Sequence, residues 1–96
     1  MLNKINQDGV LIIKLPARLD TAYSQESEAE LNETDVDCDS MVFDFSDVNF
    51  ISSYFIRICL NKYKTFGNDK FKIVNVKSEI KKVFMIAGLD KIISVH

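Results

Sequence analysis

The stretch that most constrains the fold of this chain is MVFDFSDVNFISSYFIRICL, at positions 41–60. Positions 41–45 form a run of strand length that is apolar except at Asp44, which suits a central strand buried on both faces. Beyond a short turn, apolar residues recur in pairs at 55/56 and 59/60, which is the spacing of a helix that packs one side against a sheet. A strand that leads through a turn into such a helix predicts an α/β domain.

The rest of the chain alternates between strand-like and helix-like patterns. We expect strands over 2–6, 10–15, 41–45, 71–76 and 92–95, and helices over 21–31, from Ser53 to Gly67, and from a cap at Ser78 to Gly88. The order β-β-α-β-α-β-α-β predicts a single domain over 1–96 with a mixed, mostly parallel sheet of about five strands, a hairpin at its start and helices packed on one side. We place the acidic segment 32–40 in a loop, and Lys62 on the solvent side of its helix.

Composition and charge exclude several classes of function. The chain has 96 residues and a formal net charge of −2, so it offers no general basic surface for nucleic acid. No run is long and apolar enough to cross a membrane, and the N-terminus does not resemble a signal peptide, so we expect a cytoplasmic protein without membrane insertion. Cys38 and Cys59 have the spacing of neither a metal site nor a redox pair.

Two turns are candidates for one functional surface. Ser52 and Ser53 stand at the expected start of a helix, where unpaired backbone N–H groups and the helix dipole favour a negatively charged group such as phosphate. Asp20 is the expected N-cap of the first helix. Because both turns follow strands, we expect them at the carboxyl edge of the sheet. The simpler alternative is that these residues only cap helices, which is worth about 1 kcal/mol each.

The sequence offers little support for an enzyme. Asp44 and Asp47 flank the end of the central strand, and a carboxylate pair would suit a metal or acid–base chemistry. However, no histidine or further carboxylate converges on them in the sequence. We find no nucleophile–base set and no glycine-rich phosphate loop. We therefore expect no catalytic residue, no metal site and no cofactor.

Three strings of the chain resemble the STAS domain, a family named after sulfate transporters and anti-sigma-factor antagonists. ARLDTAYSQESEAEL is similar to the family's G-x-L-D string at the start of its first helix. VFDFSDVNFISSYFIRICL is similar to hhhDhSxVxFhDSSGhxxLh, where h is apolar, and this string is the most specific. EIKKVFMIAGLDKIISVH is similar to the family's ending, hxxhhxhxGLxxhhxh. The resemblance extends from Val10 to His96.

The resemblance implies a regulatory binding protein. In the antagonists of this family, a partner anti-sigma factor that is a serine kinase phosphorylates the serine after the motif's aspartate, and that serine corresponds to Ser53. The unmodified domain docks on the anti-sigma factor, displaces the sigma factor and so starts transcription. Asp20 matches an aspartate near the family's partner-binding surface. The residues implied in partner binding are Asp20, Ser52, Ser53, Tyr54 and Phe55.

The motif departs from the family pattern at three positions. Ser52 stands in place of the aspartate, Tyr54 in place of the second serine and Phe55 in place of the glycine. We expect one of the two aromatic side chains to face outward, where it would make a partner contact.

A second interpretation is a STAS-like assembly module that is not phosphorylated. Some bacterial proteins that resemble this family are small subunits of larger complexes, including lipid-transport ATPases. The incomplete motif favours this interpretation. The C-terminal half also has a basic bias that either orients a partner or is simply solvated; its lysines are Lys62, Lys64, Lys70, Lys72, Lys77, Lys81, Lys82 and Lys91.

Overall fold

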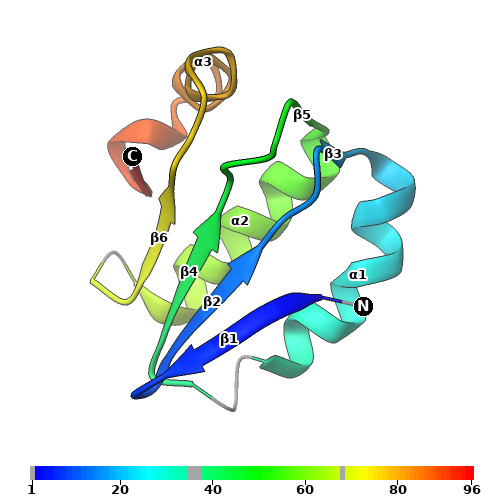
Figure 1. Cartoon of the computed structure of the whole chain (residues 1–96). Helices are drawn as coiled ribbons and strands as arrows, with labels where there is room; N and C mark the ends of the chain where they lie inside the picture. The colour runs from blue at the N-terminus through cyan, green and yellow to red at the C-terminus, as the bar shows by residue number, and fades with distance from the viewer. Residues whose placement is uncertain (1, 35–37, 68) are drawn as a thin grey trace.

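The main sheet of the molecule is mixed and mostly parallel, as the sequence predicts (Figure 1). The computed structural model describes residues 2–34, 38–67 and 69–96. Within these residues the sheet has the order β1-β2-β4-β6-β7, with β1 antiparallel to β2 and the other neighbours parallel. Its strands are β1 (Asn3–Gln7), β2 (Val10–Lys14), β4 (Ser40–Asp44), β6 (Phe71–Val74) and β7 (Ser94–Val95). The predicted fold class is confirmed.

Helices connect the parallel strands. They are α1 (Thr21–Glu33), α2 (Ser53–Phe66) and α3 (Ser78–Ile86), and a short 3-10 helix, η2 (Leu89–Lys91), follows α3. In Figure 1, α1 and α2 lie behind one face of the sheet, and α3 lies beyond the end of β6. Within the described ranges, no helix combines the length and the apolar character that crossing a bilayer requires.

The core lies between the sheet and the helices. Successive side chains of a strand point to opposite faces, so Met41 and Phe43 of β4 and Phe71 and Ile73 of β6 face the helices and are almost fully buried. The ring of Phe43 meets Phe71 edge-on at 5.1 Å between centroids and lies 5.9 Å from the ring of Phe55 in α2. These aromatic contacts fix the beginning of α2 on the sheet.

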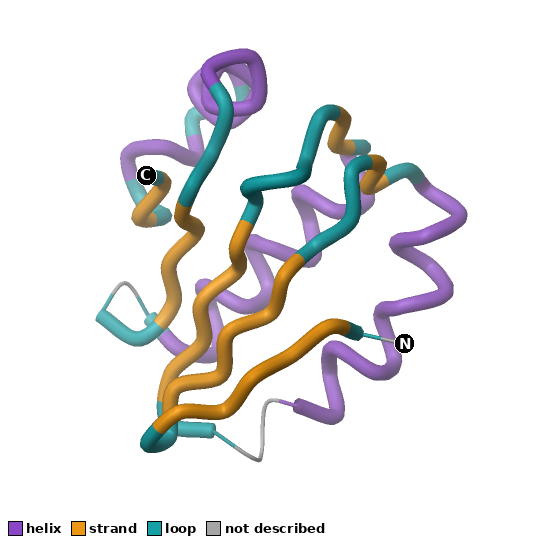
Figure 2. The backbone as a smooth tube through the Cα atoms, in the orientation of Figure 1, coloured by secondary structure: helices purple, strands orange, loops and turns teal. Residues whose placement is uncertain are grey.

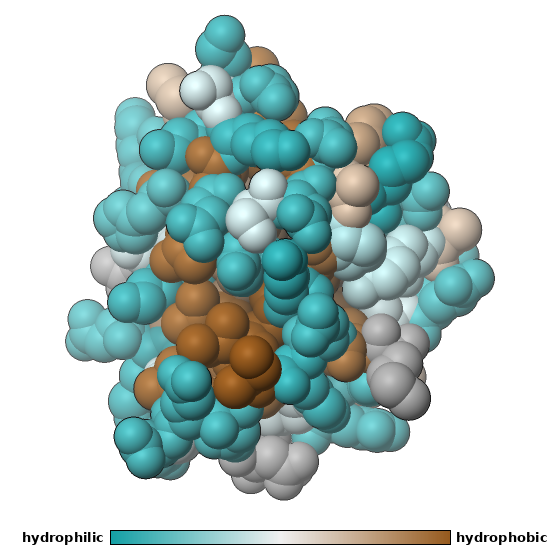
Figure 3. Space-filling view, in the orientation of Figure 1, coloured by the Kyte–Doolittle hydropathy of each residue, from teal (hydrophilic) through white to brown (hydrophobic). Residues whose placement is uncertain are grey.

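The opposite face of the sheet carries the other alternate side chains. Ile5, Ile12 and Val42 form one row across β1, β2 and β4 because they are register partners. Figure 3 shows apolar side chains gathered over these strands, surrounded by hydrophilic ones. Ile5 is 55% exposed at the end of the row, whereas Val42 is largely covered by its neighbours.

Two short strands were not predicted. β3 (Arg18–Leu19) and β5 (Phe50–Ile51) pair in parallel as a separate two-stranded sheet beside the starts of α1 and α2 (Figure 2). Leu19 and Ile51 point into the core and are 0% and 8% exposed. Strands of two residues are too short to produce an alternating pattern, so periodicity has no power to detect them.

Several local expectations need correction. α1 continues to Glu33, so the predicted acidic loop over 32–40 begins later, and positions 35–37 of that loop lie outside the described residues. Ser78 is the first residue of α3 and not its cap. The N-cap position is taken by Lys77, whose side chain makes no capping hydrogen bond. Helix ends are the least certain part of a prediction from periodicity.

Lys62 is buried, although the sequence pattern placed it in solvent. Its side chain is 1% exposed, and Nζ donates hydrogen bonds to the Leu31 carbonyl oxygen at 3.1 Å and to Asn32 Oδ1 at 3.0 Å. Both acceptors lie at the C-terminal end of α1, where carbonyl groups lack partners within the helix and a cation is favoured. The long side chain reaches from α2 to α1, and Lys62 therefore ties the two helices together.

Candidate functional site

The candidate site lies where α1 and α2 begin. Asp20 caps α1, and its Oδ1 accepts a hydrogen bond of 2.9 Å from Tyr23 N. Ser52 caps α2, and its Oγ accepts a hydrogen bond of 3.3 Å from Phe55 N. The two caps directly follow the paired strands β3 and β5, and Ser52 N donates to the Leu19 carbonyl oxygen at 2.8 Å. The structure thus brings Asp20 and Ser52 to one surface, as the sequence indicated.

Ser53 is the first residue of α2, and its side chain is exposed. The first backbone N–H groups of a helix have no partners within the helix, and the helix dipole gives this end a partial positive charge. The first turn of α2 contains no acidic residue. A negatively charged group on Ser53 Oγ would therefore meet a favourable field.

The two aromatic residues after Ser53 have different environments. Phe55 is fully buried and packs its ring against Phe43, so the expectation that its side chain contacts a partner is wrong. Tyr54 is half-buried and its hydroxyl donates a hydrogen bond of 2.5 Å to Glu28 Oε1 of α1. This hydrogen bond, with a smaller contribution from burial, raises the pKa of the Tyr54 phenol. The guanidinium of Arg57 lies 5.8 Å from the centre of the tyrosine ring.

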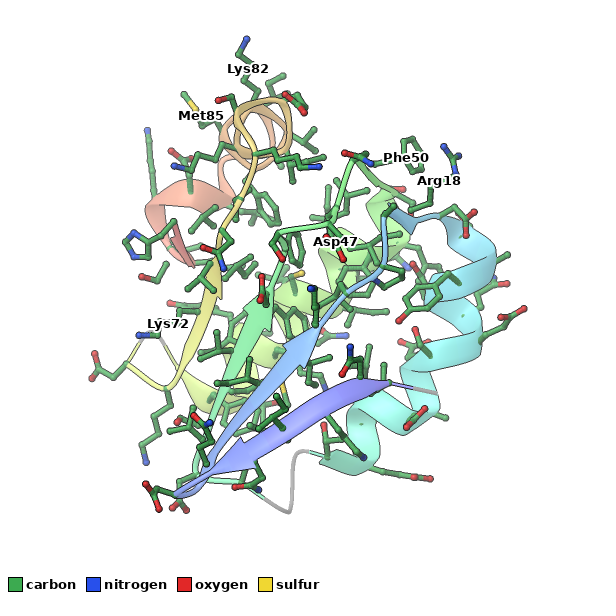
Figure 4. All side chains as sticks on the ribbon, in the orientation of Figure 1. Arg18, Asp47, Phe50, Lys72, Lys82 and Met85 are labelled. Carbon is green, nitrogen blue, oxygen red and sulfur yellow. The ribbon has the colours of Figure 1, made fainter. Side chains whose placement is uncertain are left out.

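The structure adds two residues that the sequence analysis did not single out, Arg18 and Phe50. The Arg18 guanidinium carbon lies 4.6 Å from the centre of the Phe50 ring, a cation–π distance. The two residues are register partners in β3 and β5, and both are exposed beside the starts of the helices (Figure 4). The only available signal was their alternation with the apolar residues Leu19 and Ile51, over too few positions to be recognised.

The carboxylates at the end of β4 are engaged in structural contacts. Asp44 Oδ1 accepts hydrogen bonds from Ser46 N at 2.9 Å and from Asn75 Nδ2 at 3.1 Å. Desolvation alone would raise the pKa of Asp44, but these hydrogen bonds and the charge of Lys14 outweigh it and hold the pKa below its ordinary value. Asp47 pairs with Lys14 at 3.6 Å. Within the described residues, no group of histidine, cysteine and acidic side chains is arranged to hold a metal.

Solved structures of anti-sigma-factor antagonists share this fold. The unphosphorylated form of the Bacillus antagonist SpoIIAA has a TM-score of 0.81 at 15% identity, over 100% of this chain and 88% of that chain. An antagonist from Mycobacterium paratuberculosis has a TM-score of 0.77 at 22% identity, over 100% and 84%. A serine-to-glutamate variant of RsbS from Moorella thermoacetica has a TM-score of 0.75 at 16% identity, over 99% and 85%.

No curated protein matches the chain in sequence. The family model for the STAS domain, in contrast, matches residues 1–96. The match includes the turn at Ser52 and Ser53 and the whole sheet described above. Sequence and fold agree that this protein belongs to the STAS domain family.

Proposed function

We propose that this domain is an anti-sigma-factor antagonist that acts in the bacterial cytoplasm and is switched by phosphorylation of Ser53. In the unmodified state it docks on a kinase-type anti-sigma factor through the surface around Asp20, Ser52, Ser53 and Tyr54. The domain itself binds and does not catalyse. The observation that carries the proposal is the exposed hydroxyl of Ser53 at the first position of α2, which corresponds to the phosphorylated serine of the family.

The proposed switch acts on the interface and leaves the fold intact. The partner kinase transfers the γ-phosphoryl group of ATP to Ser53 Oγ, so ADP leaves and the hydroxyl proton passes to a base of the kinase. The phosphate adds roughly −1.5 to −2 charges at neutral pH. The start of α2 can accept this charge because its first turn has no acidic residue. A partner surface that is shaped for a neutral hydroxyl cannot accept this charge.

Relatives of known structure support this proposal. SpoIIAA has been solved in a phosphorylated form, with a TM-score of 0.74 to this chain. The RsbS variant carries glutamate in place of a serine, which introduces negative charge. One relative is thus known in a phosphorylated form and another with an added negative charge, and Ser53 is the residue of this chain on which we propose a comparable charge.

Mass spectrometry of the protein purified from its native cells tests the proposal. We expect a mass increase of one phosphate located on Ser53, and a kinase-type anti-sigma factor in the same sample. In vitro, Ser53→Asp should weaken binding to that factor by at least about tenfold, since an uncompensated charge in an interface costs on the order of several kcal/mol. Ser78→Asp is the matched control, because Ser78 is also an exposed first helical residue. Equal binding by Ser53→Asp and the parent would overturn the proposal.

The alternative is an assembly subunit that is never phosphorylated, for example of a lipid-transport ATPase. The observation that favours it is Ser52, which serves as an uncharged cap where the family has an aspartate. The same purification separates the two functions. An unmodified Ser53 together with a transport ATPase would establish the alternative, and Ser52 and Ser53 would then be caps on a binding surface.

A further inference from the structure

We propose that Arg18 and Phe50 are the anchor of the docking surface, and that the partner receives them in an apolar pocket with a carboxylate at its rim. This inference rests on the proposed function, since it names the part of the surface that holds the kinase-type anti-sigma factor. Arg18 lies in the string ARLDTAYSQESEAEL and Phe50 in the string VFDFSDVNFISSYFIRICL, but neither is among the residues that the resemblance implies in partner binding.

The backbone holds the anchor in one place. In the paired strands β3 and β5, side chains alternate, so Leu19 and Ile51 point into the core while Arg18 and Phe50 point outward. Ser52 N donates to the Leu19 carbonyl oxygen at 2.8 Å and closes the ladder directly before α2. An anchor on a hydrogen-bonded base loses little freedom when it binds, and such preorganisation favours affinity.

Phe50 is an unusual side chain for a solvated surface. Its side chain is 42% exposed, and of the large apolar side chains exposed within the described residues it alone is aromatic and alone adjoins the start of α2. The others are exposed elsewhere, on β1, on α3 and directly after η2; they are Ile5, Met85, Ile86 and Ile92. Aromatic and arginine side chains are enriched among the residues that carry most of the energy of protein interfaces. A partner pocket that covers the free face of the Phe50 ring would use this area.

The charge of Arg18 indicates what lies at the rim of that pocket. Its side chain is 66% exposed, and one face of the guanidinium is occupied by the Phe50 ring at 4.6 Å. Asp20 Oδ2 lies 4.0 Å from Arg18 Nε, at the limit of an ion pair, and the other carboxylate oxygen of Asp20 is bound to Tyr23 N. The outward N–H groups of Arg18 are therefore suited to a bidentate bond with a carboxylate of the partner.

Figure 4 shows suitable controls for both members of the anchor. Met85 is a large apolar side chain that is 59% exposed on α3, and Lys82 is an exposed cation on the same helix. Both point away from the body of the molecule on α3, apart from Arg18 and Phe50 on β3 and β5. Because Phe50 and Arg18 are exposed, their replacement should leave the fold intact.

Site-specific photo-crosslinking in the native cells tests the placement. p-Benzoylphenylalanine in place of Phe50 should form an adduct with a kinase-type anti-sigma factor, at a partner peptide that contains apolar residues next to aspartate or glutamate. The same probe in place of Met85 should give no such adduct. An adduct from position 50 with a transport ATPase subunit instead would overturn both the partner named here and the proposed function.

Titration with the purified anti-sigma factor tests the energetics. Phe50→Ala and Arg18→Ala should each weaken binding by about tenfold to thirtyfold, as expected for interface residues of this type. Arg18→Lys should restore only part of the loss, because an ammonium group lacks the planar fork. Met85→Ala and Lys82→Ala should bind like the parent. If the parent binds, Ser53→Asp does not, and Phe50→Ala binds like the parent, the anchor is refuted while the proposed function stands.

Discussion

α1 and α2 begin side by side, yet the two helix starts are stabilised in different ways. At the cap of α1 a carboxylate of Asp20 accepts a hydrogen bond of 2.9 Å, whereas at the cap of α2 the hydroxyl of Ser52 accepts one of 3.3 Å. The N–H donors sit at equivalent positions, on half-buried Tyr23 and on fully buried Phe55. The start of α1 thus depends on a charged cap and the start of α2 on the core. Only the start of α2 still has room for a negative charge.

The largest effect on the free energy of unfolding is expected at the start of α2, which depends on the core. Phe55→Ala should lower the free energy of unfolding by about 3–5 kcal/mol, because it leaves a cavity beside Phe43 and Phe45. Tyr23→Ala, at the equivalent position of α1, should cost distinctly less because Tyr23 is only partly buried. Urea unfolding followed by circular dichroism measures both. If Tyr23→Ala lowers the free energy of unfolding as much as Phe55→Ala does, then core packing does not distinguish the start of α2 from the start of α1, and the comparison is refuted.

The charged cap should give the next largest effect. Asp20→Ala should lower the free energy of unfolding by about 1–2 kcal/mol, because it removes both the bond to Tyr23 N and a negative charge at a helix N-terminus. Ser52→Ala removes a longer and uncharged hydrogen bond and should cost about 0.5–1 kcal/mol. The same urea titrations test the order of the two values. If Ser52→Ala proves the more costly, hydrogen-bond length and charge do not rank the caps.

A smaller effect, of opposite sign, should follow when charge is added. Ser53→Asp should raise the free energy of unfolding by about 0.3–1 kcal/mol, because it places a carboxylate in the first turn of α2. Thr21→Asp makes the same change in α1 but sets the new charge beside Asp20, so little or no gain is expected there. Low-salt urea titrations of both variants, repeated at high salt, test the electrostatic origin. Destabilisation by Ser53→Asp would mean that α2 does not tolerate the phosphate that we propose.

The difference between the helix starts also shows what the sequence could predict. The main strands, α2 and α3 were predicted from runs or repeats of apolar residues. α1 was predicted from its cap at Asp20, and Ser52 was predicted as a cap from its residue type. The sequence left open whether Phe55 faces the core or the solvent. The apolar stripe of α2 that contains Phe55 continues at Ile58 and Cys59, which are buried. Lys62 continues the same stripe, and was misplaced because its residue type was weighed above its position.

The surface of the candidate site was harder to predict than the elements that carry it. Arg18 and Phe50 meet through two strands of two residues each, and the pairing joins segments far apart in the chain. Such a contact depends on the tertiary arrangement and leaves no periodic trace in either segment. The sequence could indicate that two turns share an edge of the sheet, but not which side chains that edge exposes.

The smallest expected effect concerns the bond that joins the two helix starts. Tyr54 at the start of α2 donates to Glu28 in α1, and this bond raises the pKa of the phenol above its ordinary value near 10. Glu28→Gln should lower the Tyr54 pKa toward that value, which an NMR titration of the tyrosine ring can measure. The raised pKa means that the contribution of this bond to stability is present below pH 10 and disappears as the pH rises through the pKa of the folded state. The parent should therefore lose more stability than Glu28→Gln when the pH increases from 9 to 11. An unchanged Tyr54 pKa in Glu28→Gln would show that burial, and not the contact between the helices, raises it, and the two helix starts would then be independent of each other.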